Sequence, residues 1–294
     1  MVTRPAYQKN KQVLAAIDLS HYAISVADCA AWAASQLKAP LQLLNIADRS
    51  VKDSLHELRG GMSEKALQLL LDELMSQDES NPKPLGKQHG RALLQALFER
   101  VVAGYGIQPQ IQQCQGKLID ILMDAQDETG LCVLGKRGET ADYSKGNLGS
   151  NLEAAIRGLQ CPVLVASRNF KPVRRFLIAF DGSPSTRKCI ELVCSNTLVK
   201  GAECDLLMVA DTPSNEQQLD LEWAKQRLQM GGFRANAWVA SGSPEVAIAQ
   251  QIEANRVDLL AMGAYGHSRL RTMFAGSTTS RILRTCLVPV LVVR

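Results

Sequence analysis

The sequence lacks the long apolar segments of membrane and secreted proteins. No stretch of its 294 residues approaches the ~18 consecutive apolar residues that a membrane helix needs. Residues 1–5 also lack the apolar core of a secretory signal. We therefore expect a cytoplasmic protein that has no membrane partner.

The chain also has little net charge. The chain holds 33 Lys and Arg residues against 29 Asp and Glu residues, a net charge of +4, and it contains no basic run. A surface that binds nucleic acid usually needs a clustered positive patch. The charge pattern therefore predicts no nucleic-acid partner, and the net charge alone identifies no other partner.

The cysteines and histidines lack the spacings of metal sites and disulfide frameworks. Eight cysteines occur without a C-x-x-C pair, and none of the four histidines lies four residues from another. Most of the cysteines have apolar neighbours, as at 131–133. We expect structural thiols in a reducing compartment, with a metal or redox role as the alternative, and we predict no metal site.

What the sequence does contain is an internal repeat. With 46% hydrophobic and 21% charged residues it reads as a globular protein, and its length suggests two domains of ~150 residues. Residues 13–20 match 176–183 at a separation of 163 positions, whereas 161–165 match 288–292 at a separation of 127. The difference of 36 positions indicates an insertion in the first half.

The repeat divides the chain into two similar domains. We place the first domain at residues 1–168, with an inserted helical segment at about 49–90, and the second at 171–294. Helix propensity and periodicity predict a helix at 64–74 within the insertion. The polar stretch 167–172, which ends in proline, separates the two domains.

Short apolar runs alternate with longer amphipathic segments in both domains, as in βαβ units around a parallel sheet. A serine followed by proline at 183–184 and at 243–244 predicts two helix starts, because serine caps a helix and proline suits its first position. We predict an α/β fold with two similar domains, each a five-stranded parallel sheet with flanking helices (Rossmann-like). The expected strands lie near 12–17, 41–46, 110–114, 131–134 and 162–166, and near 175–180, 204–209, 234–239, 257–262 and 288–292.

A glycine-rich loop follows the fourth expected strand of each domain. In the second domain, Gly263 and Gly266 are followed, after nine residues, by Gly276, Ser277 and Thr278. Glycines let a phosphate approach the backbone, and a helix N-terminus offers N–H groups that lack internal partners. The loop therefore predicts an anion site, with turn formation and helix capping as the structural alternative.

The first domain repeats this loop with one extra residue. Its matching positions are Gly135, Gly138, Gly149, Ser150 and Asn151, with ten residues between the second and third glycines. Lys136 and Arg137 add positive charge to this loop. Because the extra residue can displace Ser150, we expect one tight site per chain, in the second domain.

Two aspartates follow the first strands. Asp18 and Asp181 stand at the carboxyl edge of each expected sheet, where parallel α/β folds bind ligands. We expect ligand contact there, with a turn or cap role as the alternative. Ile46 and Val209 end the second strands at the same edge and can pack on a base or belong to the core. The chain has no P-loop motif, and no G-x-G-x-x-G follows either first strand.

The aspartate after strand one, the G-x2-G-x9-G-[ST] loop after strand four and the closing Val-Pro-Val-Leu-Val-Val strand resemble the universal stress protein A family in its tandem-domain form. Many members of that family bind ATP and others do not. The resemblance implies ATP as the ligand, with Mg²⁺ as a further expectation. It implies nucleotide contacts for Asp181, Val209, Met262, Gly263, Gly266, His267, Gly276, Ser277 and Thr278, and in the first domain for Asp18, Ile46, Leu134, Gly135, Gly138, Gly149, Ser150 and Asn151.

Within that set, the resemblance implies different roles. Asp181 would meet the ribose or the metal–phosphate end, Val209 the adenine, and Met262 would border the base. The glycines, Ser277 and Thr278 would meet the ribose and phosphates. For His267, a solvent-facing place in the loop is the alternative to phosphate contact.

The resemblance also implies a function. We expect a cytoplasmic ATP-binding stress-response protein that acts as a nucleotide-dependent regulator and runs no high-turnover reaction. Two alternatives stay open. One is a slow ATPase or an autophosphorylating phosphotransfer protein, in which Ser277 or Thr278 accepts phosphate. The other is a scaffold that binds a small ligand other than a nucleotide.

The last strand of each domain is apolar and can lie at a sheet edge, which proteins usually cover. In single-domain relatives two chains pair at this strand, so the resemblance implies that the two halves pair as an internal pseudo-dimer. A short linker favours this pairing by raising the effective concentration of one half near the other. A further homodimer through the inserted helix at 64–74 is left open.

Overall fold

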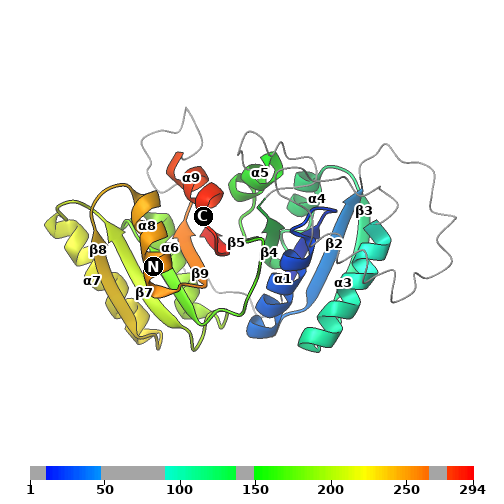
Figure 1. Cartoon of the computed structure of the whole chain (residues 1–294), viewed down its shortest axis with the longest axis horizontal. Coiled ribbons are helices and arrows are strands. Elements are labelled where there is room, and N and C mark those ends of the chain that lie inside the picture. The colour runs from blue at the N-terminus through cyan, green and yellow to red at the C-terminus, as the bar shows by residue number, and fades with distance from the viewer. Residues whose placement is uncertain (1–10, 48–89, 137–148, 265–276) are drawn as a thin grey trace.

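The two halves of the chain form one continuous sheet (Figure 1). The computed structural model describes residues 11–47, 90–136, 149–264 and 277–294. Within these residues, ten strands follow the order β3-β2-β1-β4-β5-β10-β9-β6-β7-β8. Each half contributes five parallel strands, so the predicted α/β fold is confirmed.

Strands and helices alternate along both halves. The first half contains β1 (Gln12–Ile17), α1 (Ala23–Leu37), β2 (Leu41–Ala47), α3 (Gly90–Tyr105), β3 (Gln110–Gln115), α4 (Leu118–Asp124), β4 (Thr129–Gly135), α5 (Ser150–Gly158) and β5 (Val163–Ala166). The second half contains β6 (Arg175–Ala179), α6 (Pro184–Ser195), β7 (Glu203–Val209), α7 (Asn215–Met230), β8 (Ala235–Ala240), α8 (Pro244–Asn255), β9 (Leu259–Gly263), α9 (Ser277–Thr285) and β10 (Val290–Val293). Every strand starts and ends within two residues of its predicted range.

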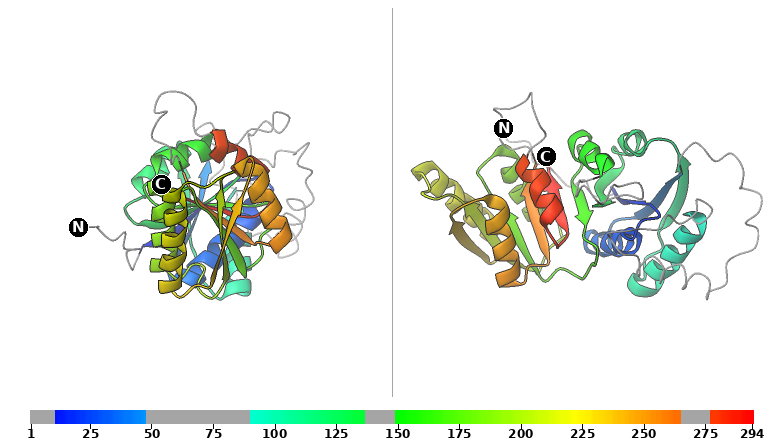
Figure 2. Two further views of the ribbon diagram at one scale, coloured as in Figure 1. Left: turned by 90° about the vertical axis from the view of Figure 1, so that its left-hand side faces the viewer. Right: turned by 45° about the horizontal axis from the view of Figure 1, so that its top comes forward.

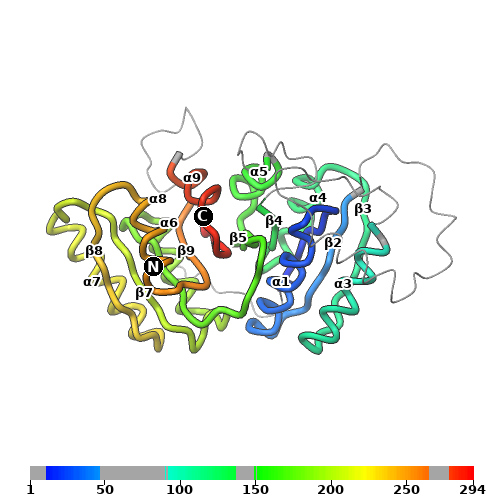
Figure 3. Tube along the Cα trace, in the orientation of Figure 1, coloured from blue at the N-terminus to red at the C-terminus, as the bar shows by residue number. Residues whose placement is uncertain are grey.

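The two halves join through their last strands. β5 and β10 pair in the antiparallel sense, with Val165 opposite Val290 and Val163 opposite Val292. All four valines are buried. Figure 3 shows the two halves on either side of this pair, each with its own parallel strands. The internal pairing that was expected from the apolar last strands is therefore present.

Helices cover both faces of the sheet, as the first view of Figure 2 shows. One apolar cluster joins the sheet to α1, α3, α6 and α7, and a second cluster joins its other face to α4, α5, α8 and α9. Neighbouring strand residues alternate between the clusters, since Val13 belongs to the first and Leu14 to the second. A sheet covered on both faces needs apolar residues at successive positions, which explains the short apolar runs in the sequence.

The two predicted Ser-Pro helix starts differ in the structure. At α6, Ser183 is the N-cap, its side chain accepts a hydrogen bond from the N–H of Thr186, and Pro184 follows. At α8, Ser243 occupies the N-cap position before Pro244, but its side chain makes no capping hydrogen bond. Both predicted helix starts are therefore confirmed, with serine at the N-cap and proline at the first turn, but only the Ser183 hydroxyl makes the capping hydrogen bond.

The inserted segment at about 49–90, including the helix predicted at 64–74, lies outside the described residues except for Gly90, where α3 begins. None of the helices that the structure describes combines the length and the apolar character needed to cross a bilayer.

Candidate functional site

The strand order of the second half reverses between β6 and β9. From β6 the chain continues to β7 on one side, and from β9 it continues to β10 on the other. Asp181 follows β6 by two residues, and Gly263 ends β9. Ala179 pairs with Met262 across these strands, so the carboxyl ends of β6 and β9 lie side by side. Open α/β sheets bind ligands at such a reversal, outside the carboxyl ends of the strands.

Asp181 organises the turn between β6 and α6. Its Oδ1 accepts hydrogen bonds from the N–H of Ser183 at 3.0 Å and from the hydroxyl of Thr186 at 2.9 Å. The residue is nevertheless exposed. Asp181 therefore has the turn role that was the alternative for it, and the same bonds hold an exposed carboxylate at the carboxyl edge.

Gly263 is needed for close packing between β9 and α6. A Cβ atom at this position would lie 2.7 Å from the backbone N of Thr186 and 2.9 Å from the carbonyl carbon of Ser185. Real Cβ atoms do not approach backbone so closely. The glycine therefore lets the first turn of α6 reach the end of β9, which supports the structural explanation for this member of the loop.

A cluster at the start of α6 and on α7 adds to this turn, and sequence analysis did not predict it. Arg187 donates from Nε to the carbonyl of Gly182 at 3.1 Å and forms an ion pair with Asp220. Its guanidinium lies 4.5 Å from the ring centroid of Trp223. Gly182 has a φ of 77°, and a Cβ there would collide with the Asp220 carboxylate. The only sequence signal is the three-residue spacing that places Asp220 and Trp223 on one face of α7.

The remaining candidates of the second half lie around the same edge. Val209 ends β7 and is half-buried, whereas Met262 is buried. Thr278 is half-buried in the first turn of α9. Because α9 connects the parallel strands β9 and β10, it begins at the carboxyl edge. Gly266, His267 and Gly276 lie outside the described residues, as does the side chain of Ser277.

The first half has an aspartate turn at the matching place. Asp18 Oδ1 accepts from the N–H of Ser20 at 3.1 Å and from its hydroxyl at 2.5 Å. Ile46 is half-buried and Leu134 is buried. The other candidates are Gly135 at the end of β4, Gly149 at the N-cap of α5 and the exposed Asn151 within α5. Gly138 and the side chain of Ser150 lie outside the described residues.

Lys136 has a role that its position in the first glycine loop does not reveal. Its side chain is buried, and Nζ donates to the carbonyl oxygen of Cys286 at 2.8 Å. Cys286 directly follows α9 in the second half. The positive charge expected for the first loop is therefore in contact with the other half of the protein. Arg137 lies outside the described residues.

All eight cysteines are free thiols, and five are buried. Burial raises the pKa of the Cys189 thiol to about 12 and that of the Cys194 thiol to about 11. A thiol with a raised pKa is a weak nucleophile at neutral pH, because the thiolate is the reactive form. Within the described ranges, no group of three His, Cys, Asp or Glu side chains is placed to hold a metal ion.

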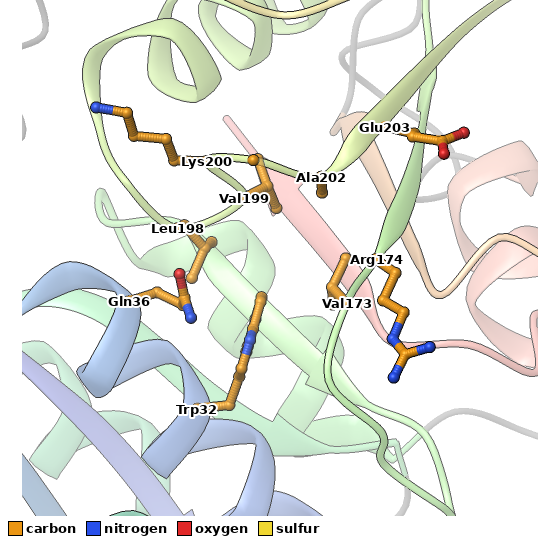
Figure 4. A pocket seen from close by; sticks show the side chains of 10 residues that line it. Trp32, Gln36, Val173, Arg174, Leu198, Val199, Lys200, Ala202 and Glu203 are labelled. Carbon is orange, nitrogen blue, oxygen red and sulfur yellow. The ribbon is translucent and has the colours of Figure 1, made fainter.

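A pocket of about 390 Å³ lies at the amino ends of β6 and β7, away from the carboxyl edge of the second half (Figure 4). Trp32 and Gln36 of α1, Arg174 of the linker and the turn at 198–203 line it. The Lys200 ammonium points away from Trp32 in Figure 4. None of the predicted site residues belongs to this pocket, which lies at the junction of the two halves.

The whole chain resembles known proteins. A model of the universal stress protein family matches residues 9–167 and again 172–294. Universal stress protein Slr1230 of Synechocystis sp. is 32% identical over 288 residues, which cover 97% of this chain and 100% of that protein. Universal stress protein YxiE of Bacillus subtilis is 26% identical over 145 residues, covering 41% of this chain and 98% of that protein. The crystal structure of a universal stress protein from Archaeoglobus fulgidus has a TM-score of 0.69 at 21% identity and covers 97% of this chain and 98% of its own. The chain therefore belongs to the universal stress protein family and carries two family domains in tandem.

Proposed function

We propose that the second half binds ATP together with Mg²⁺ at the carboxyl edge of its sheet, and that the protein is a nucleotide-dependent regulator in the cytoplasm. The observation that carries this proposal is the position of Asp181 just beyond β6 and of Gly263 at the end of the adjacent β9, where the strand order reverses. Ligands bind at this point in open α/β sheets. Membership of the universal stress protein family supports a stress-response role.

The residues at this edge suit the parts of a nucleotide. Half-buried Val209 at the end of β7 offers apolar surface for a base, whereas Met262 near the end of β9 is buried and would border the base only if the site opens. The exposed Asp181 carboxylate suits a ribose hydroxyl or Mg²⁺, which prefers oxygen ligands. Thr278 offers a hydroxyl in the first turn of α9, where N–H groups lack helical partners.

Two helices start near this edge, and their charges distinguish them. The first turn of α6 is already capped by Ser183 and lies beside the Asp181 carboxylate, which disfavours a second anion there. The first turn of α9 contains no acidic residue. Because a helix N-terminus attracts negative charge, we place the phosphates at α9 and the metal or ribose end at Asp181.

Calorimetric titration of ATP and Mg²⁺ into the full chain tests the proposal. Asp181→Asn keeps an oxygen for Ser183 and Thr186 but removes the charge, and we expect it to weaken ATP binding about tenfold, in line with the loss of one charged contact. Asp18→Asn is the matched control in the first half and should leave the tight site within about twofold. Native mass spectrometry should find one tightly bound nucleotide per chain. A parent protein that binds no nucleotide contradicts the proposal and favours the scaffold alternative.

A further inference from the structure

Lys136 links the end of β4 in the first half to helix α9 in the second half. The residue directly follows Gly135, the last residue of β4, and is 8% exposed. Its Nζ donates to the carbonyl oxygen of Cys286 at 2.8 Å. Since β5 and β10 run antiparallel, the carboxyl end of β4 faces the end of the sheet at which α9 finishes. The contact is therefore a consequence of how the two halves pair.

A second cation makes the reciprocal contact. Arg294, which follows β10, donates from its guanidinium to the carbonyl oxygen of Arg157 in the last turn of α5. Each half thus supplies a cation to the C-terminal end of the other half's helix after the fourth strand. The Arg294 contact is exposed, whereas Lys136 is buried, so the two contacts differ in their surroundings.

The Lys136 ammonium lies at the C-terminal end of helix α9. The C-terminal end of a helix carries a partial negative charge, so a buried ammonium stabilises it. Helix α9 spans Ser277–Thr285, and Thr278 stands in its first turn. A helix of this length is about 13 Å long and behaves as a rigid rod, so a contact with the carbonyl of Cys286, the residue that directly follows α9, also helps to set the place of its first turn.

Two further contacts locate α9 along its length. Arg281 forms an ion pair with Glu245 of α8 at 2.8 Å, and the hydroxyl of Ser280 lies 3.5 Å from Glu153 of α5. The first contact ties α9 to its own half and the second to the other half. Lys136 contacts the C-terminal end of α9, the end that is most distant from Thr278. Neither the Arg281 contact nor the Ser280 contact lies at that end.

We propose that Lys136 is a positioning residue, supplied by the first half, for the nucleotide site of the second half. The inference rests on the proposed function, because it assigns α9 to that site. Only the first half supplies a buried cation at this position of its loop. The matching residue of the second half is Ala264, which is buried and carries no charge.

Three variants of the full chain test the proposal. Lys136→Met keeps the apolar stem and removes the ammonium, Lys136→Arg restores a cation, and Arg294→Met removes the reciprocal cation. Hydrogen exchange of the amides in residues 277–285 is measured without nucleotide, and ATP affinity is measured by calorimetry. We expect Lys136→Met to speed exchange in α9 and to weaken ATP binding about tenfold, the scale of one lost charge-assisted hydrogen bond. Lys136→Arg should recover most of both effects.

The controls separate the possible outcomes. Arg294→Met should leave exchange in α9 and ATP affinity within about twofold of the parent, because its partner lies on α5. Unchanged exchange in α9 on Lys136→Met overturns the link between the halves. Faster exchange with unchanged ATP affinity overturns the positioning role. A parent that binds no ATP overturns the proposed function and the positioning role together, and the exchange data still decide whether Lys136 holds α9.

Discussion

The carboxyl edges of the two halves carry the same aspartate in different surroundings. Asp181 is exposed and accepts hydrogen bonds from Ser183 and Thr186, whereas Asp18 is half-buried and accepts from the N–H and the hydroxyl of Ser20. Helix α6 starts with a serine cap and a proline, whereas α1 starts after Tyr22, whose side chain makes no capping bond. The repeat has kept the features that the sheet needs and has changed those that a ligand would meet.

The helices after the two aspartates explain this difference. Eleven of the fifteen residues of α1 are buried, against six of the twelve residues of α6. The residues that lead into α1 are buried as well, including Ser20 and Tyr22, while Pro184 at the start of α6 is exposed. The residues at the start of α1 therefore pack inside the protein and are not exposed to a ligand. This comparison supports a single tight nucleotide site, in the second half.

The largest expected effect comes from a charge placed where the halves join. Val290→Asp buries a carboxylate between β5 and β9, and we expect a loss of more than about 4 kcal/mol in the free energy of unfolding. Val165→Asp, in the directly opposite position of β5, should have an equal effect. Small-angle scattering should show separated halves for both variants. A compact Val290→Asp protein with the stability of the parent would contradict the pseudo-dimer.

A smaller but still large loss is expected at Gly263, where the second half depends on close packing. Gly263→Val would drive side-chain atoms into the backbone of Ser185 and Thr186, at a cost of about 3 kcal/mol. Denaturant unfolding measures this cost, and calorimetry should show ATP binding lost as the first turn of α6 moves. As the control, Gly104→Ala adds a Cβ in open space on α3 and should stabilise the protein by up to about 1 kcal/mol. Equal stability of the two variants would refute the packing argument.

The Arg187 cluster distinguishes the second half, because Ile24 is the matching residue of the first half. Arg187→Met should cost about 1 to 2 kcal/mol, since it removes the ion pair with Asp220 and the contact with Trp223. Lys188→Met, at the next and exposed position of α6, should change the free energy of unfolding by less than about 0.5 kcal/mol. Urea unfolding of both variants provides the comparison, and equal losses would show that the cluster contributes nothing.

Sequence patterns predicted the sheet well because its signals are local. Apolar runs mark the central strands, whereas the edge strand β3 has the polar sequence QIQQCQ. The internal repeat matches Asp181 with Asp18 after the first strand of each half, and Gly263 with Gly135 at the end of the fourth. The capping box of α7, in which Ser214 and Gln217 bond to each other's backbone, also has a local signature, S-x-x-Q.

Contacts between distant segments left no such signal. The partner of Lys136 is a backbone carbonyl 150 positions away, and a carbonyl has no residue identity that a sequence can reveal. The same holds for Gly263, whose close neighbour is the backbone of α6. At Ser243 the local pattern predicted a cap, but the pattern specifies only that a hydroxyl is available and not where its side chain turns.

The smallest expected effect depends on pH and again separates the halves, because Asp258 of the second half stands where the first half has Gly130. Burial alone would raise the pKa of Asp258, but hydrogen bonds from Lys171 and from the N–H groups of Arg174 and Arg175 lower this pKa overall. Folding therefore favours the carboxylate, so its stabilisation is present above the unfolded pKa of ~3.9 and is lost as the pH falls through the lower folded pKa.

Asp258→Asn keeps one oxygen for the backbone N–H groups but removes the charge that faces Lys171. We expect it to lower the free energy of unfolding by about 1 kcal/mol at pH 7, and the deficit should shrink at low pH, where the parent aspartate is protonated too. Denaturant unfolding at pH 7 and near pH 3 measures this, with Asp127→Asn at an exposed position as the control. A deficit of the same size at both pH values would mean that the charge of Asp258 does not hold the linker at this end of the second half.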